Sequence, residues 1–216
     1  MFANLGDFKN FFYDWGGLNE WLFLQINSLR GGTYDTVMLL ITKLGDHKIF
    51  PYVLIGLLGY VFVASIFRKL SGRGAIKPRL VMWFGIFTVL IAGFAVNGLF
   101  TIYAKDYFEY ERPYVALESK DVHLLEPQEI DDDKRSFPSG HVGFITFLII
   151  SLWPAFRDDW KWYSLLVVAA VGWTRVSLGV HYPADVLWSF LFTTTIIITV
   201  RAVTYTILRK LFNVVC

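Results

Sequence analysis

The sequence predicts an all-α fold, a polytopic membrane helical bundle of five transmembrane helices preceded by interfacial helices near the N-terminus. Of its 216 residues, 55% are hydrophobic and only 18% are charged, and the mean hydropathy is +0.48. Soluble domains are less apolar and carry about 25% charged residues. Several long uncharged runs approach the ~20 apolar residues that a spanning helix needs. The length suits a single membrane domain over residues 1–216 and leaves no room for a second one.

Two short apolar segments occupy the N-terminal part, Leu18–Leu29 and Tyr34–Leu44. They are apolar on one side and are interrupted by Asn27 and by Arg30-Gly31-Gly32. We interpret residues 1–47 as two amphipathic helices that lie at the membrane surface or are shallowly re-entrant. An alternative joins the two segments into a sixth span, against which the paired glycines and the flanking charges argue.

Residues 48–208 are expected to form the transmembrane core, because five apolar segments follow one another there. These segments are Ile49–Phe67, Leu80–Tyr103, Gly140–Ala155, Tyr163–Leu178 and Val186–Val200. The last three are short unless their ends lie in the membrane interface. Tryptophans and tyrosines fall near the segment ends, as they do in the aromatic belt of membrane proteins.

The charged residues in the connecting loops predict the orientation. The loop Arg68–Arg79 carries five basic residues and no acid, whereas Asp106–Lys134 is long and acidic. Short cytoplasmic loops are enriched in lysine and arginine. With five spans, the basic loops all lie on one side, so the acidic loop faces the periplasm or the outside of a cell inner membrane.

Composition also excludes several classes of function. A net charge of +2 without a basic block offers nothing to nucleic acid. The single cysteine, Cys216, rules out an internal disulfide and a cysteine metal cluster. The other polar candidates are weak, because His47 precedes the first span as an interface residue, and His123 and the run Asp131-Asp132-Asp133 belong to a loop expected to be solvated.

The first cluster of polar residues, Lys105 and Arg112-Pro113, ends the second span. Seven residues are about two helical turns, so both cations are expected on nearly one face of a helix that Pro113 terminates. Snorkelling anchors are the simplest explanation for this pair alone.

The second cluster, Pro138-Ser139-Gly140-His141, opens the third span. We expect Ser139 to cap the helix and Gly140 to let backbone N–H groups approach a ligand. The N-terminus of a helix binds anions, and His141 lies in that turn. An ordinary capped helix start explains the cluster equally well on its own.

The third cluster lies between the last two spans. Arg175 is predicted in the final helical turn before a Gly179 C-cap, and Pro183 begins the next helix with Asp185 in its first turn. Asp185 can then accept a hydrogen bond from one ring nitrogen of His181 and leave the other nitrogen free as a nucleophile. A structural cap is the alternative.

Taken together, the patterns Lys-x6-Arg-Pro, Pro-Ser-Gly-His and Arg-x5-His-x3-Asp over Lys105–Asp185 resemble the type 2 phosphatidic acid phosphatase superfamily. All three patterns occur in order and with the family's internal spacings. One departure is Thr174, since many members have serine before this arginine, but a hydroxyl is retained. The N-terminal hundred residues match only in general character.

The resemblance implies a role for each residue. His181 is the expected nucleophile, Asp185 orients it, and His141 protonates the leaving oxygen and then activates water. The phosphoryl oxygens are expected to contact Lys105, Arg112, Ser139, Gly140 and Arg175. The resemblance implies neither a metal nor another cofactor.

The expected function is therefore a membrane lipid phosphatase that acts at the extracytoplasmic face, with a phosphorylated lipid and the bilayer as its only inferred partners. Undecaprenyl pyrophosphate is the first choice of substrate. Phosphatidylglycerophosphate, phosphatidate or lipid A 1-phosphate, and transfer of the phosphoryl group to another lipid, remain enzymatic alternatives. A lipid flippase or a structural membrane protein is the alternative from a different class.

Overall fold

The computed structural model describes residues 9–71, 76–125 and 133–212, and helices are the only regular elements in these ranges. The long helices are α4 (Phe50–Leu70), α5 (Ile76–Phe108), α7 (Gly140–Leu152), α8 (Asp158–Ser177) and α9 (Pro183–Phe212). Shorter ones are η1 (Asn10–Asp14), η2 (Trp15–Gly17), α2 (Leu18–Asn27), α3 (Gly32–Thr42), η3 (Lys43–Gly45), η4 (His47–Ile49), α6 (Pro113–Ala116) and η6 (Trp153–Ala155). The all-α prediction is confirmed.

Each of the five predicted spans corresponds to one of the long helices. Three stretches within the described ranges are long and apolar enough to cross a membrane: His47–Leu70, Arg79–Ala116 and Pro183–Leu211. Gly140–Ala155 is apolar but shorter. α4 has one buried residue, Phe50, and exposes a row of large apolar side chains. An apolar surface of this extent is typical of a helix in contact with lipid.

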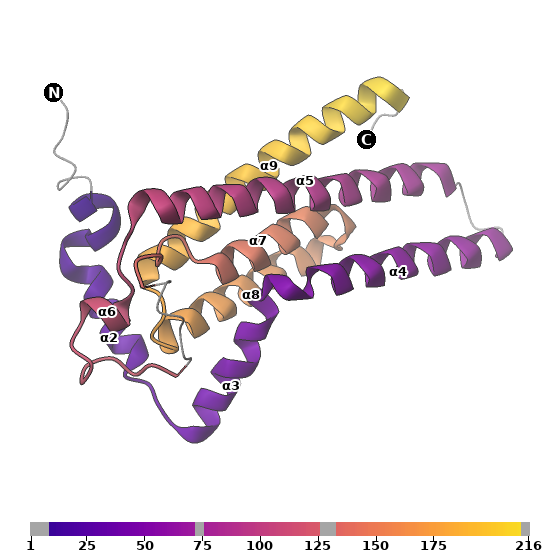
Figure 1. Cartoon of the computed structure of the whole chain (residues 1–216). Helices are drawn as coiled ribbons and strands as arrows, with labels where there is room; N and C mark the ends of the chain where they lie inside the picture. The colour runs from indigo at the N-terminus through magenta and orange to yellow at the C-terminus, as the bar shows by residue number, and fades with distance from the viewer. Residues whose placement is uncertain (1–8, 72–75, 126–132, 213–216) are drawn as a thin grey trace, which may run out of the picture.

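Helix α7 forms the centre of the bundle and packs against α5, α8 and α9 (Figure 1). Ten of its 13 residues are buried. Close approach depends on glycine, because a Cβ on Gly143 would lie 3.1 Å from the Ser189 hydroxyl on α9, and one on Gly93 of α5 would lie 2.8 Å from Ile197. The close packing fixes the helix ends that carry the polar motifs.

The N-terminal segments form two separate helices, so the alternative of one joined sixth helix is wrong. α2 ends at Asn27, and the chain turns through Gly31, whose φ is +150°, before α3 begins. Figure 1 shows the two helices meeting at an angle. α2 packs against α8 and α9, and α3 packs against α8. Their position relative to a membrane surface stays a prediction.

Candidate active site

The three sequence clusters meet at one end of the bundle (Figure 1). The C-terminal end of α5, the N-terminus of α7 and the turn between α8 and α9 all lie there. α9 begins at Pro183, as predicted, and α8 ends at Ser177. Gly179 follows with φ +81°, and its N–H donates to the Val176 carbonyl. The predicted glycine turn before His181 is therefore present.

His181 and Asp185 form a buried hydrogen-bonded pair. His181 Nδ1 lies 3.2 Å from Asp185 Oδ2, and the two residues are 2% and 0% exposed. The same oxygen accepts hydrogen bonds from the Ser136 hydroxyl at 2.6 Å and from the Tyr182 N–H at 2.9 Å. With the carboxylate as acceptor, Nδ1 carries the proton and Nε2 keeps its lone pair.

The charges around His181 favour its neutral form. Burial lowers the pKa of His181 well below its ordinary value, and the neighbouring charges of Arg112, Arg175 and Lys105 lower it further. The fold therefore brings all three predicted cations near the imidazole. A neutral imidazole among three cations is suited to attack an anionic centre that the cations attract.

Lys105 and Arg112 reach this position from two different segments, so the prediction of one continuous helix is wrong. α5 ends at Phe108 because Glu109 adopts a left-handed conformation, with φ +47°. Arg112 has an extended backbone and precedes α6. Pro113 therefore begins a helix and does not end one. The Arg112 guanidinium is buried and donates to the Val180 carbonyl at 3.0 Å, which ties it to the turn that carries His181.

Arg175 occupies the last turn of α8, as predicted, and is 3% exposed. Its Nη1 donates to the Thr42 hydroxyl at the end of α3, at 2.8 Å. The N-terminal region thus orients one of the cations, through a contact that no local sequence pattern predicts.

Ser139 stands at the N-cap of α7, but the prediction that its side chain caps the helix is wrong, since it makes no capping hydrogen bond. The Ser139 hydroxyl is fully buried, and within the described ranges it has no hydrogen-bond partner. Its carbonyl accepts from Ser189 at 2.7 Å, and Gly140 and His141 begin the helix. An unsatisfied hydroxyl beside the N–H groups of a helix N-terminus is an arrangement that binds an anion.

The remaining sequence candidates lie outside this group. His47 is an exposed residue, with 70% of its side chain accessible. The prediction that His123 is solvated is wrong, because its ring is largely covered and its Nε2 lies 3.6 Å from Asp35. Asp131 and Asp132 lie outside the described residues, whereas Asp133 accepts hydrogen bonds from the Arg112 N–H and the Tyr114 hydroxyl.

Two contacts of Asp185 were missed from the sequence. Ser136 lies two residues before the second cluster, and no motif in the sequence assigns it a role. Tyr13 comes from η1 and donates to Asp185 Oδ1 at 2.8 Å across 172 positions of sequence. No local pattern marks this tyrosine.

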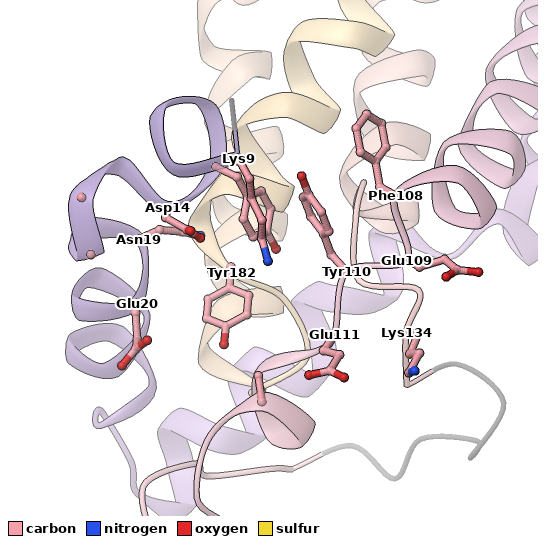
Figure 2. A pocket seen from close by; sticks show the side chains of 14 residues that line it. Lys9, Asp14, Asn19, Glu20, Phe108, Glu109, Tyr110, Glu111, Lys134 and Tyr182 are labelled. Carbon is pink, nitrogen blue, oxygen red and sulfur yellow. The ribbon is translucent and has the colours of Figure 1, made fainter. Parts of the chain in front are cut away.

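A polar pocket of about 810 Å³ lies beside the buried pair. Figure 2 shows Lys9, Asp14, Glu20 and Tyr182 on one side of the pocket and Tyr110, Glu109, Glu111 and Lys134 on the other. Lys9 Nζ lies 5.0 Å from the centre of the Tyr110 ring. The pocket contains none of the predicted site residues, and Tyr13 and Tyr182 separate it from Asp185.

Within the described ranges, no three histidine, cysteine, aspartate or glutamate side chains gather in a group that could hold a metal ion. The site residues are cations, two histidines, one carboxylate and backbone N–H groups. Such a set offers donors to a phosphate group and holds opposite charge beside it.

Comparison with known proteins adds independent findings. The chain matches the PAP2 superfamily over residues 82–209. It is 33% identical over 175 residues to undecaprenyl-diphosphatase BcrC of Bacillus subtilis strain 168, and the alignment covers 80% of this chain and 77% of that protein. An undecaprenyl-diphosphatase of Sulfolobus acidocaldarius is 27% identical over 181 residues, with 81% of this chain and 73% of the relative covered.

Two solved structures share the fold. LpxE of Aquifex aeolicus aligns with a TM-score of 0.60 at 30% identity, over 85% of this chain and 94% of its own. A transmembrane PAP2 type phosphatidylglycerolphosphate phosphatase from Bacillus subtilis aligns with a TM-score of 0.63 at 20% identity, over 90% of this chain and 88% of its own.

Proposed function

Because this chain belongs to the PAP2 superfamily and is a membrane lipid phosphatase, we propose that it hydrolyses a lipid pyrophosphate through a phosphohistidine on His181. The observation that carries this proposal is the buried His181–Asp185 pair, surrounded by Lys105, Arg112 and Arg175. The hydrogen bond that Nδ1 donates to Asp185 fixes the imidazole, and the cations supply the charge that a transferring phosphoryl group needs.

In the first half of the reaction, the lone pair on His181 Nε2 attacks phosphorus. The new P–N bond forms as the bond between phosphorus and the bridging oxygen breaks. His141 gives a proton to that oxygen, and the lipid monophosphate leaves. Asp185 accepts the Nδ1 hydrogen bond throughout and balances the positive charge that develops on the phosphorylated ring.

In the second half, His141 takes a proton from a water molecule, whose oxygen attacks phosphorus. The P–N bond breaks, its electron pair returns to Nε2, and inorganic phosphate is released. The phosphoryl oxygens are held by Lys105, Arg112 and Arg175 together with the Ser139 hydroxyl and the Gly140 N–H. A general acid–base group of this kind typically contributes about 10²–10⁴-fold in rate.

The names of the relatives support undecaprenyl pyrophosphate as the substrate, since two of them are undecaprenyl-diphosphatases. An apolar groove of about 370 Å³ between α8 and α9 is suited to binding a long hydrocarbon tail. Its wall includes Val142 and Val176, the residues that follow His141 and Arg175 in sequence. The groove is thus lined by the same helices that carry His141 and Arg175, which favours a substrate with a hydrocarbon chain.

The site is proposed to face the periplasm or the outside of the cell membrane. Figure 1 shows the motif-bearing helix ends at the opposite end of the bundle from the C-terminal end of α4. The last turn of α4 carries Arg68 and Lys69. Basic residues favour the cytoplasmic side, so the phosphate site lies on the other side.

A substrate panel tests the activity with the purified protein in mixed micelles. Phosphate release is measured from undecaprenyl pyrophosphate, phosphatidylglycerophosphate, phosphatidate, lipid A 1-phosphate and a short soluble ester. We expect the highest kcat/KM for undecaprenyl pyrophosphate, because tail binding also orients the phosphoryl group. Equal efficiency on the soluble ester would contradict a lipid substrate, and a tenfold preference for another lipid would reassign it.

His181→Ala tests the covalent mechanism, with His47→Ala as its matched control. Loss of the nucleophile is expected to lower kcat by roughly 10³-fold or more while the protein still inserts and folds. The exposed His47 variant should retain wild-type turnover. Substantial turnover by a folded His181→Ala protein would refute the phosphohistidine.

Cysteine labelling tests the face. In a Cys216→Ser background, a cysteine replaces Glu118 or Ser71, both of which are exposed. An impermeant thiol reagent added to intact cells should label the first variant and spare the second. The reverse pattern would place the site at the cytoplasmic face.

A further inference from the structure

Tyr13 brings the N-terminal segment into direct contact with the buried pair. Its hydroxyl donates to Asp185 Oδ1 at 2.8 Å, and the residue is 6% exposed. Tyr13 belongs to η1, far outside residues 82–209 that match the superfamily. The contact therefore joins the N-terminal segment to the part of the chain that matches the superfamily.

We propose that Tyr13 is a positioning residue, which fixes the Asp185 carboxylate and through it the His181 imidazole. The inference rests on the proposed function of His181 as the nucleophile. Within the described ranges, no hydrogen bond joins Tyr13 to His141 or His181, so its effect on the reaction passes through Asp185.

The distribution of donors on the carboxylate explains why Tyr13 matters. His181, Ser136 and the Tyr182 N–H all approach Oδ2. Within the described ranges, Oδ1 accepts a hydrogen bond from Tyr13 alone. A carboxylate held by one oxygen can turn about its Cβ–Cγ bond. The hydroxyl on the second oxygen fixes the plane of the carboxylate, and with it the direction of the acceptor that faces His181.

Tyr13 is itself held rigidly enough to serve this role. Its ring packs against Tyr110, Phe137 and Tyr182, with ring centroids 4.3, 5.7 and 6.2 Å apart. The indole of Trp188 on α9 donates to the Phe12 carbonyl at 2.7 Å, which ties the segment to the same helix as Asp185. Burial and the neighbouring Asp185 raise the pKa of the Tyr13 hydroxyl well above its usual value, so it remains a donor.

Tyr110 provides a matched control. Its ring packs against that of Tyr13, and Figure 2 shows it on the wall of the polar pocket. No hydrogen bond joins its hydroxyl to Asp185 in the described structure. Tyr13→Phe and Tyr110→Phe therefore each remove one tyrosine hydroxyl from the same aromatic cluster, but only the first removes a donor from the carboxylate.

Steady-state kinetics is the first test. Tyr13→Phe is expected to lower kcat about tenfold at an unchanged KM, because a charge-assisted hydrogen bond to the carboxylate is lost. Tyr110→Phe should keep kcat within about twofold of the wild-type value. In an Asp185→Asn background, Tyr13→Phe should add less than about twofold, since the two residues act as a unit.

A second readout does not depend on turnover. In protein labelled with ¹⁵N-histidine, the Nδ1–H proton resonance of His181, assigned with His181→Gln, reports its hydrogen bond to Asp185. We expect this resonance to move upfield in Tyr13→Phe and to stay in place in Tyr110→Phe.

The two readouts separate the inference from the proposed function. An active wild type with an unchanged kcat or an unchanged His181 resonance in Tyr13→Phe would overturn the positioning role. If Tyr13→Phe instead raised KM and lowered the melting temperature, the contact would be purely structural, and the positioning role would also be overturned. A wild type that releases no phosphate would overturn the proposed function, and the resonance would still decide whether Tyr13 positions the pair.

Discussion

Replacing Asn27 with alanine should destabilise the protein through three lost hydrogen bonds. Asn27 is fully buried at the end of α2. Its Nδ2 donates to the carbonyls of His123 and Ser177, at 2.9 Å each, and its Oδ1 accepts from the His123 N–H at 2.7 Å. One side chain thus joins α2, the loop before the second cluster and the end of α8.

The expected loss follows from counting these bonds. Each hydrogen bond contributes about 1 kcal/mol net, so the three together stabilise the fold by about 3 kcal/mol. For a chain of this size, that corresponds to a decrease of roughly 6–12 °C in the melting temperature. Because Ser177 directly precedes the turn to His181, turnover at a temperature where both proteins are folded should also fall.

Thermal unfolding in detergent, followed by tryptophan fluorescence, measures the change. Gln25→Ala on the exposed side of the same helix is the control and should melt with the wild type. Asn27→Asp keeps the acceptor for His123 but cannot donate to the two carbonyls, so it should be destabilised as well. A melting temperature for Asn27→Ala within about 2 °C of wild type would refute the reasoning, because three net hydrogen bonds cannot be so weak.

Three further predictions concern the site. Gly179→Ala should lower both the melting temperature and kcat, because Gly179 has φ +81° and an added Cβ would lie 2.7 Å from the His123 carbonyl oxygen. Gly98→Ala in α5 is the control and should be tolerated, because a Cβ there meets nothing within 4 Å. Equal behaviour of the two variants would contradict this prediction. Vanadate should inhibit at micromolar to millimolar concentrations and EDTA should not, since the proposed phosphate ligands are cations and N–H groups; activity that EDTA abolishes and magnesium restores would disprove metal independence. The pKa of His181 is lower in the folded than in the unfolded chain, so the unfolded chain binds an extra proton below about pH 6.5. The melting temperature of wild type should therefore fall relative to that of His181→Gln as the pH drops from about 7.5 to about 5.5. If the difference between the two melting temperatures stayed constant over this range, the lowered pKa of His181 would be refuted.

The parts of the fold that local chemistry determines could be predicted from the sequence. Runs of apolar residues marked all five long helices, and Pro183 and Gly179 marked the turn that carries His181. The His181–Asp185 pair spans only five residues, because Asp185 lies in the first turn of the helix that begins at Pro183. Hydrogen bonds over such short spans follow from backbone geometry, which the residue types dictate.

Contacts between distant segments could not be predicted. Asn27 seemed to interrupt an apolar helix, yet it is fully buried because its polar atoms find partners on α8 and in the loop at His123. Glu109 ends α5 in a left-handed conformation, which non-glycine residues rarely adopt, so the spacing of Lys105 and Arg112 was misinterpreted as helical. Tyr13 and Thr42 depend on how η1 and α3 pack, and no periodicity encodes that packing.

The burial of α7 bears on how the protein is made. With 13 residues, α7 rises about 20 Å, less than the ~30 Å hydrocarbon core of a bilayer. One of its close neighbours, α9, begins only at Pro183, so it leaves the ribosome after α7 is complete. During that interval the face of α7 that carries Gly143 lacks Ser189 and Thr193 of α9, which pack against it in the folded bundle. Stable insertion of α7 is therefore expected to await synthesis of α9, and chains truncated before Pro183 should be degraded rather than accumulate in the membrane.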